Sequence, residues 1–363
     1  MVKNPSSQFK ISKEKLDLTV DGQPLVKYTV SNGQGLELSV LNYGGIITSL
    51  KMPNKLGLYE NVVLGFDCIE DYLSNQAYIG AIIGRCSNRI AQAQFTLENT
   101  VYQLDQNEGA NNLHGGYRGF DKVIWNIETI INQNSVELKL KYTSPDGEGG
   151  FPGNLKTTVM YTLNSDLSLK IQYKATTDKK TIVDLTHHSY FNLSSNIKSD
   201  IVDHIITINS NQYLPVNENL IPTGKILDVE GTAFDFTKPT KINKVLEKGQ
   251  WESDSQRNSA FNQFFILNKN SKDDLWFGAS SYHQKTGRLM EVWTDAPGLQ
   301  YYTGNFLDMA MPEKKSDIFK KRNGFCFEFH CHPNAINEDK FPSIILNPGN
   351  VYESCTLFQF SVL

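Results

Sequence analysis

The sequence lacks the features that mark several large classes of protein. Its five cysteines are odd in number, widely spread and free of any CxxC pair, so a disulfide framework is not indicated. No window approaches the roughly 18 consecutive apolar residues that span a bilayer, and the first residues contain no apolar segment of a secretory signal. The net charge of −4 does not indicate a nucleic-acid partner. We therefore expect a cytoplasmic protein that binds neither nucleic acid nor membranes.

Helical patterns are scarce as well. Only residues 240–247 and 313–320 show a short, lysine-rich helical pattern, and we expect both at the periphery. The chain instead alternates apolar and polar residues, which is typical of half-buried antiparallel strands. The clearest runs are Val136–Tyr142, Lys156–Leu163 and Leu169–Lys174.

The chain also shows no internal boundary. Turn signals separate the alternating runs, and no linker with a shift in composition divides the 363 residues. We interpret the polar stretch 252–260 as a surface loop. The sequence therefore predicts an all-β protein, with one large antiparallel β-sandwich domain over residues 1–363 that is ordered from about residue 8.

The run Phe325–His330 gives the first indication of a functional site. In an extended strand the three phenylalanines point to one face, while Cys326, Glu328 and His330 point to the other. Glutamate is rarely buried without a partner, so a carboxylate held beside a phenylalanine layer is a candidate general base. The same pattern also fits an edge strand whose polar face meets water, or a glutamate paired with an arginine.

Histidines and arginines supply further candidates. His187 and His188 are adjacent, and on a strand they point to opposite faces, so at most one of them lines a given cavity. His114 precedes two glycines that permit close approach of backbone or ligand. Arg85 and Arg89 each fit a structural ion pair or the binding of a hydroxyl-rich ligand.

A metal site is an alternative interpretation of the same strand. Glu328, His330 and His332 are spaced by two residues and share one strand face, as in half of a zinc or iron site. Such a site needs one or two further ligands, and Pro333 indicates that the strand ends there.

Over nearly its full length the chain resembles the aldose 1-epimerases, also called galactose mutarotases. Many short motifs match in the order of the family, which makes the combined signal specific. The family's fold is a large antiparallel β-sandwich of one domain, in agreement with the alternation described above. The matching segments are Leu41–Gly45, Asn88–Ile90, Leu113–Gly116, Gly119–Lys122, Asp146–Gly153, Leu185–Leu193, Tyr213–Val216, Ile221–Gly224, Gly298–Asp308, Cys326–Glu328 and Phe341–Ser343.

The resemblance also implies roles for single residues. Glu328 matches the family's catalytic base, and His188 matches its catalytic acid. Interconversion of the α and β anomers of a hexose such as D-galactose or D-glucose needs these two groups and no metal or cofactor. The positions that match or neighbour sugar-binding residues are Asn88, Arg89, His114, Asn262 and Gln300.

The sequence departs from the family pattern at three places. Asn262 stands where the family usually has an aspartate, so the acceptor loses its charge. Phe329 and His330 replace the usual Thr/Ser-Gln after the glutamate, Asn334 stands where an aspartate is usual after the proline, and Gly149 stands where a second glutamate is common. These changes keep open a sugar-binding or sensor protein without catalysis. The preferred hexose, and whether the protein is a monomer or a homodimer, also stay open.

Overall fold

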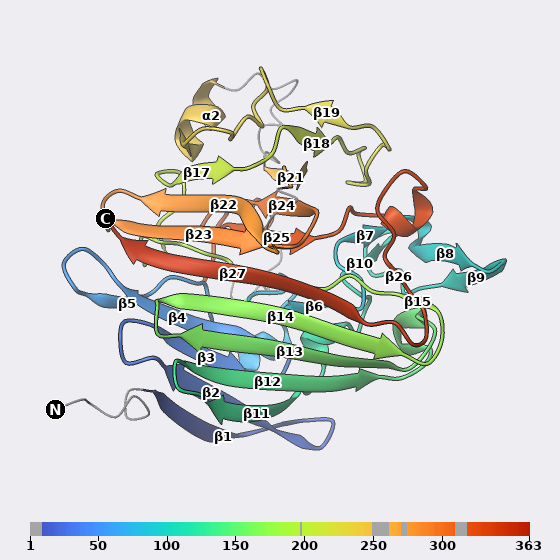
Figure 1. Cartoon of the computed structure of the whole chain (residues 1–363), viewed down its shortest axis with the longest axis horizontal. Coiled ribbons are helices and arrows are strands. Elements are labelled where there is room, and N and C mark those ends of the chain that lie inside the picture. The colour runs from blue at the N-terminus through green and yellow to red at the C-terminus, as the bar shows by residue number, and fades with distance from the viewer. Residues whose placement is uncertain (1–8, 197, 249–260, 270–273, 309–317) are drawn as a thin grey trace.

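The computed structural model describes residues 9–196, 198–248, 261–269, 274–308 and 318–363, and most of them lie in antiparallel strands or the turns between them (Figure 1). A nine-stranded sheet crosses the molecule, with its strands in the spatial order β11-β12-β13-β14-β27-β23-β22-β17-β20. Their bounds in that order are Asn126–Ile131, Ser135–Ser144, Leu155–Asn164, Ser168–Thr177, Tyr352–Val362, Arg288–Thr294, Trp276–His283, Ile205–Ile208 and Thr240–Lys241.

Side-chain alternation explains this sheet. In β12, Val136, Leu138 and Leu140 are fully buried, while the charged residues between them are half-buried. One face of the strand therefore meets the core and the other meets water, as expected for an antiparallel sheet covered on one side. All three runs predicted from alternation are confirmed, since they fall within β12, β13 and β14.

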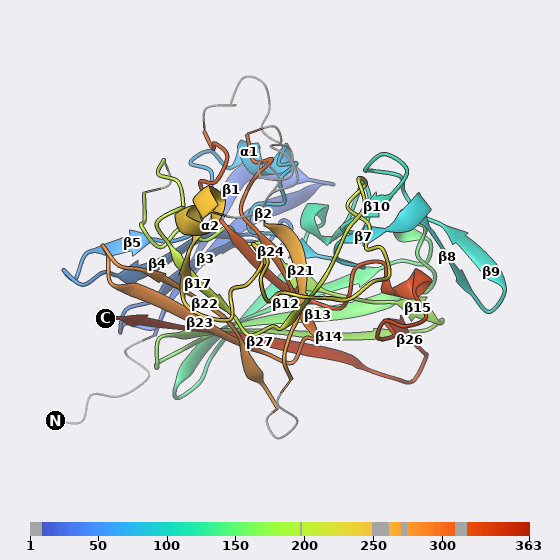
Figure 2. The ribbon, with the colours of Figure 1, turned by 90° about the horizontal axis from the view of Figure 1, so that it is seen from above.

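Two five-stranded sheets lie behind the nine-stranded one (Figure 2). The N-terminal sheet has the order β1-β2-β3-β4-β5, and the third sheet has the order β19-β18-β21-β24-β25. The bounds of the first are Lys10–Val20, Gln23–Ser31, Glu37–Leu41, Ile47–Pro53 and Tyr59–Asn61. Those of the second are Leu227–Asp228, Gln212–Leu214, Asn262–Ile266, Gly298–Tyr302 and Cys326–His330.

One continuous hydrophobic core joins these layers. Val40 of β3 and Leu138 of β12 belong to it, as do Phe327 of β25 and Val292 of β23. The N-terminal and third sheets therefore pack against different parts of the same large sheet. This arrangement confirms the predicted all-β sandwich.

Short two-stranded ladders carry the loops that approach the third sheet. The pairs are β6 with β16, β7 with β10, β8 with β9, and β15 with β26. In that order their bounds are Ile82–Ile83 with Thr186–His187, Arg89–Ile90 with Asn112–Leu113, Gln94–Leu97 with Thr100–Gln103, and Thr181–Ile182 with Ile345–Leu346.

Helix is limited to short segments in the described ranges. The α-helices are α1, Glu70–Leu73, and α2, Ile242–Lys248, and the second confirms the helical pattern predicted at 240–247. Single 3-10 turns lie at Ala91–Ala93, Phe120–Lys122, Glu148–Gly150 and Ala335–Asn337. Residues 318–320 of the other predicted helix are not helical, and its residues 313–317 lie outside the described residues, as does the loop expected at 252–260. Within the described part of the chain, no helix combines the length and apolar character needed to cross a bilayer.

Candidate active site

The two catalytic and five sugar-binding residues implied by the family resemblance all line one cavity of about 160 Å³. The cavity lies where β24 and β25 of the third sheet meet the segments that follow β16 and flank β7 and β10. Seven stretches of the chain, from residues 76–78 to Glu328, converge there. The lining residues are Gln76, Ala77, Tyr78, Asn88, Arg89, Glu108, Leu113, His114, His188, Tyr190, Asn262, Gln300, Tyr302, Phe306, Leu307 and Glu328.

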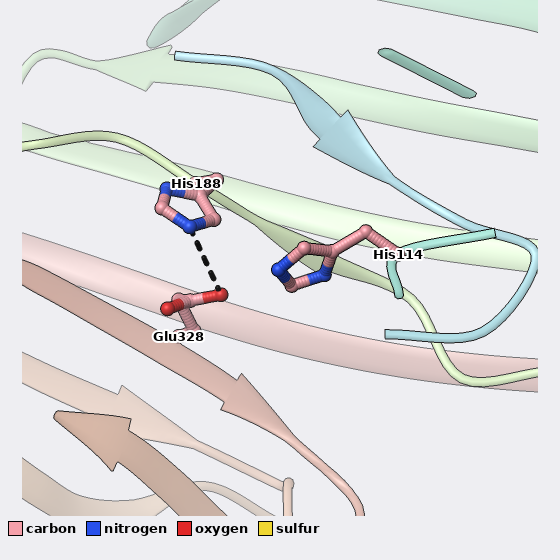
Figure 3. A group of neighbouring side chains, drawn as sticks. All are labelled: His114, His188 and Glu328. Atoms are coloured by element: carbon pink, nitrogen blue, oxygen red, sulfur yellow. Dashed lines mark ion pairs between the residues drawn. The ribbon is translucent and has the colours of Figure 1, made fainter. Parts of the chain in front are cut away.

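Glu328 projects from the middle of β25. Phe327 and Phe329, its neighbours on the strand, point into the hydrophobic core, so the glutamate points to the opposite face as predicted. Its side chain is 3% exposed, and its Oε2 accepts no hydrogen bond from the described residues. The Nε2 atom of His188 lies 3.7 Å from this oxygen (Figure 3). A buried carboxylate oxygen is thus left free to accept a proton from a ligand.

His188 follows β16, and its backbone is tied to the turn before β6. Its N–H donates to the carbonyl of Ala81 at 2.9 Å, and its carbonyl accepts from Gly80 at 3.0 Å. The adjacent His187 points away from the cavity and packs on the ring of Tyr161 at 5.6 Å. Burial, together with the neighbouring His188, lowers the pKa of His187 to about 3. The two histidines therefore occupy different environments, as their opposite strand faces require.

His114 enters the cavity from a tight turn. The residue has φ +55°, and the next residue, Gly115, has φ +94° with no space for a side chain, because a Cβ there would lie 2.0 Å from the carbonyl oxygen of Gly84. The Nδ1 atom of His114 accepts the backbone N–H of Asn88 at 3.1 Å. Burial and the nearby His188 lower the pKa of His114 well below its usual range. The ring is therefore neutral, with its proton on Nε2, the nitrogen that points toward Glu328 and His188 (Figure 3).

Three amide side chains form a connected wall. Asn88 Nδ2 donates to Gln300 Oε1 at 3.1 Å, and Gln300 Nε2 donates to Asn262 Oδ1 at 2.8 Å. Gln300 lies opposite Glu328 in the β24–β25 ladder, so this wall stands directly beside the carboxylate. The remaining donor and acceptor capacity of the amides suits sugar hydroxyls.

Arg89 and Arg85 have different environments. Arg89 lines the cavity and donates from Nε to Glu108 Oε2 at 2.6 Å and from Nη2 to Glu108 Oε1 at 2.5 Å. This two-pronged pair fixes the plane of the guanidinium. Arg85 is 2% exposed and donates to the Ser144 hydroxyl and to four backbone carbonyls around the 145–153 loop. It is therefore a structural residue.

The metal set proposed from strand spacing is not assembled. The described residues bring one group of potential ligand atoms within 4.8 Å of one another, and it consists of His114, His188 and Glu328. His330 is turned elsewhere, since its Nδ1 donates to the carbonyl of Cys331 at 2.6 Å and lies 3.5 Å from Asp184. His332 packs between the rings of Phe264 and Phe341. Strand alternation put these side chains on one face, but the strand ends at His330.

The sequence did not reveal several lining residues. Glu108 lies in a polar loop, and its pairing with Arg89 appears only when that loop folds back on β7. Tyr78 has φ +55° and packs on the His114 ring at 4.7 Å, while Tyr190 packs on the His188 ring at 4.9 Å. Tyr190 and Tyr302 lie within segments that resemble the family, and this position was the one sequence signal that could have identified them as lining residues.

Comparison with known proteins identifies the family. The sequence model of the aldose 1-epimerase family matches residues 26–359. Galactose mutarotase of Rattus norvegicus is 42% identical over 95% of this chain and 97% of its own length. Aldose 1-epimerase of Escherichia coli is 35% identical over 94% of this chain and 97% of its own length. The crystal structure of galactose 1-epimerase from Lactobacillus acidophilus superposes with a TM-score of 0.84 at 28% identity, covering 98% of this chain and 99% of that one. The chain therefore belongs to the aldose 1-epimerase family.

Proposed function

We propose that this protein interconverts the α and β anomers of a hexose such as D-galactose or D-glucose, with Glu328 as the base and His188 as the acid. The observation that carries the proposal is the distance of 3.7 Å between the Nε2 atom of His188 and the free oxygen of Glu328, two buried side chains that line the cavity. Relatives named galactose mutarotase and aldose 1-epimerase support the reaction class.

The reaction needs two proton transfers at neighbouring oxygens. Glu328 takes the proton of the C1 hydroxyl, and His188 gives its Nε2 proton to the ring oxygen. The C1–O5 bond then breaks, C1 becomes an aldehyde carbon, and both protons are accounted for on Glu328 and the new C5 hydroxyl. Rotation about C1–C2 presents the other face of the carbonyl. The ring closes when His188 takes the hydroxyl proton back and Glu328 returns its proton to the carbonyl oxygen.

The other polar lining residues hold the sugar while C1 rotates. Arg89 donates charge-assisted hydrogen bonds, and neutral His114 donates from Nε2. Asn88, Gln300 and Asn262 supply amide groups that are already linked to one another. A wall held in place before the sugar arrives loses little freedom on binding, which favours productive orientation.

We further infer that residues 1–363 form one domain that works in the cytoplasm as a monomer or a homodimer. The hydrophobic core supports the first part, because it contains residues from β2 near the N-terminus and from β27 at the C-terminus. The free state of all five cysteines supports a reducing compartment.

Polarimetry tests the reaction. Freshly dissolved α-galactose and α-glucose should relax to their anomeric equilibrium faster with the protein than in buffer alone. A folded protein that gives only the buffer rate would overturn the proposal, and sugar binding measured by calorimetry in that case would identify a sensor instead.

The variant Glu328→Gln tests the base. It keeps the shape and hydrogen-bonding capacity of the side chain but removes the proton acceptor, so turnover should be lost. Sugar binding should stay within about tenfold, or roughly 1.4 kcal/mol. Near-normal turnover by this variant would show that another group is the base.

A further inference from the structure

His188 has a second polar neighbour besides Glu328. Cys326 Sγ lies 3.5 Å from Nδ1 of His188, the ring nitrogen not directed at Glu328. Both residues are buried, with Cys326 0% and His188 4% exposed. Cys326 precedes Glu328 by two residues on β25 and therefore shares its strand face. One strand thus presents a carboxylate to one nitrogen of His188 and a sulfur to the other.

The remaining surroundings of the His188 ring are mostly aromatic. Tyr190 lies 4.9 Å away between ring centroids, and His114 lies 5.4 Å away at nearly a right angle. Tyr78 and Tyr302 lie farther out, at 5.9 and 6.4 Å. Among the described residues, the sulfur of Cys326 is the hydrogen-bonding partner of Nδ1.

We propose that Cys326 is a positioning residue for the acid: its sulfur accepts the Nδ1–H of His188 and keeps that proton in place, so that the proton exchanged with the sugar is always the one on Nε2. The inference rests on the role proposed above for His188.

The reaction explains why one nitrogen must be held. After the ring opens, His188 is neutral, and a neutral imidazole carries its single proton on either nitrogen. Closure requires a free lone pair on Nε2 to take the proton from the C5 hydroxyl. A ring with its proton on Nε2 cannot do this. A hydrogen bond from Nδ1–H to sulfur favours the productive tautomer and also fixes the plane of the ring.

The chemistry of the thiol suits this task. Burial and the negative charge of Glu328 raise the pKa of the Cys326 thiol well above its usual range, so the sulfur is a neutral, weak acceptor. A carboxylate in the same place would hold a protonated imidazole more strongly and weaken it as an acid. The other titratable groups around His188 are His114, His187, Asp121, Glu328 and the three tyrosines Tyr78, Tyr190 and Tyr302.

Three variants separate positioning from simple packing. Cys326→Ala removes the acceptor, Cys326→Ser restores an acceptor of similar size, and Cys331→Ala removes another buried thiol whose sulfur contacts the carbonyl of Pro342 instead. The rate of mutarotation of α-galactose is measured against pH and substrate concentration. We expect kcat to fall about 10- to 100-fold in Cys326→Ala with KM nearly unchanged, since a general acid contributes about 10²–10⁴-fold in total. The shape of the pH profile should change as well. Cys326→Ser should recover most of the rate, and Cys331→Ala should behave like the unmodified protein.

Nitrogen-15 NMR of the histidine-labelled protein reads the tautomer directly, without relying on any Cys326 variant that folds poorly. The signals of His188 are assigned by their loss in His188→Gln. Neutral His188 should carry its proton on Nδ1 in the unmodified protein and in Cys326→Ser, and should be a mixture of the Nδ1–H and Nε2–H tautomers in Cys326→Ala.

The possible failures are distinguishable. A neutral His188 with its proton on Nε2 in the unmodified protein, or unchanged kcat in a folded Cys326→Ala variant, overturns the role of Cys326. If His188→Gln itself keeps normal turnover, the assignment of His188 as the acid is wrong.

Discussion

At the scale of single residues, the site is built from side chains whose partners leave one functional atom free. Nδ1 of His114 is occupied by the Asn88 backbone, and Nδ1 of His188 faces Cys326. In both rings Nε2 is left for the cavity, where it meets the unpaired oxygen of Glu328. Each ring is thus oriented by a partner behind it. The chemistry depends on these partners as well as on the residue types.

The first prediction is that the two adjacent histidines respond differently to substitution. His188→Ala should lower kcat by about 10²–10⁴-fold, because it removes the proposed proton donor. His187→Ala should leave kcat within a few-fold and instead lower thermal stability, because the buried ring on Tyr161 is replaced by a cavity. Polarimetry and thermal unfolding of both variants provide the measurement. Equal kinetic losses at unchanged stability would mean that the wrong neighbour was chosen.

Asn262 makes the second prediction. In Asn262→Asp a carboxylate replaces the amide oxygen that accepts from Gln300 Nε2. The carboxylate can also accept from a sugar hydroxyl. A charge-assisted hydrogen bond of that kind exceeds a neutral one by about 1 kcal/mol, so KM for galactose should fall by about fivefold. Asn262→Ala is the matched control and should raise KM, because the acceptor is lost. A higher KM in Asn262→Asp would show that the chain uses the neutral amide to select its sugar.

At the scale of elements, the sequence predicts the strands but not where strands from different sheets come together. Alternation in β12, β13 and β14 encodes which face is buried, and the same rule oriented Glu328 on β25. No local pattern encodes that β7, β16 and β25 converge, because that depends on how two short ladders pack against the third sheet. The family resemblance supplied this long-range information for the seven predicted residues.

Residues outside the matched motifs show which parts of the site the sequence does not predict. Glu108 and Tyr78 lie in loops whose positions are set by tertiary contacts with Arg89 and His114. The metal alternative failed for a related reason. Spacing by two residues places side chains on one face only while the strand lasts, and β25 ends at His330. Periodicity therefore predicts orientation within an element but not the contacts beyond its end.

Arg85 makes the third prediction, at the scale of a loop. Its guanidinium donates to the carbonyls of Ser144, Pro145, Pro152 and Gly153, which close the turn between β12 and β13. Arg85→Met leaves these acceptors without their donor and should destabilise the fold by at least about 3 kcal/mol. The loss of stability in Arg85→Lys should be smaller than in Arg85→Met, since one ammonium group replaces only part of the hydrogen bonds of the guanidinium.

The measurement is chemical denaturation, with Arg118→Met as the control for loss of an arginine. Arg118 makes an exposed ion pair with Asp21, so its loss should change stability little. Because Arg85 does not line the cavity, its folded variants should keep KM and kcat within a few-fold. A large kinetic loss at full stability would show that the loop takes part in catalysis.

At the scale of the whole molecule, burial holds most of the histidines neutral. Burial lowers the pKa of His187 and His204 to about 3 and that of His332 to about 4, and it also lowers those of His114 and His283. His330 differs, because the hydrogen bond and charge of Asp184 outweigh its burial and raise its pKa.

These shifts predict that acidification destabilises the fold. In the unfolded chain a histidine has a pKa of about 6.5. Between about pH 7 and pH 5, His187, His204 and His332 therefore bind protons in the unfolded state and stay unprotonated in the folded state. Stability therefore falls as pH decreases, and each group contributes up to about 2 kcal/mol over this range. His330 adds nothing to this slope at the acidic end, because it is protonated in both states there. Its own contribution has the opposite sign and is lost as pH rises above about 6.5.

Urea denaturation at several pH values gives the free energy of unfolding and hence the number of protons taken up. The matched variant is His204→Gln. The glutamine amide keeps one donor and one acceptor at this buried position, where His204 Nε2 accepts from the backbone of Leu193 at 2.9 Å and Nδ1 donates to the carbonyl of Ile201 at 3.0 Å. We expect the slope of stability against pH to decrease by close to one proton in this variant, because one neutral buried histidine no longer distinguishes the two states. An unchanged slope would mean that His204 is protonated in the folded protein, and that the acid sensitivity originates elsewhere.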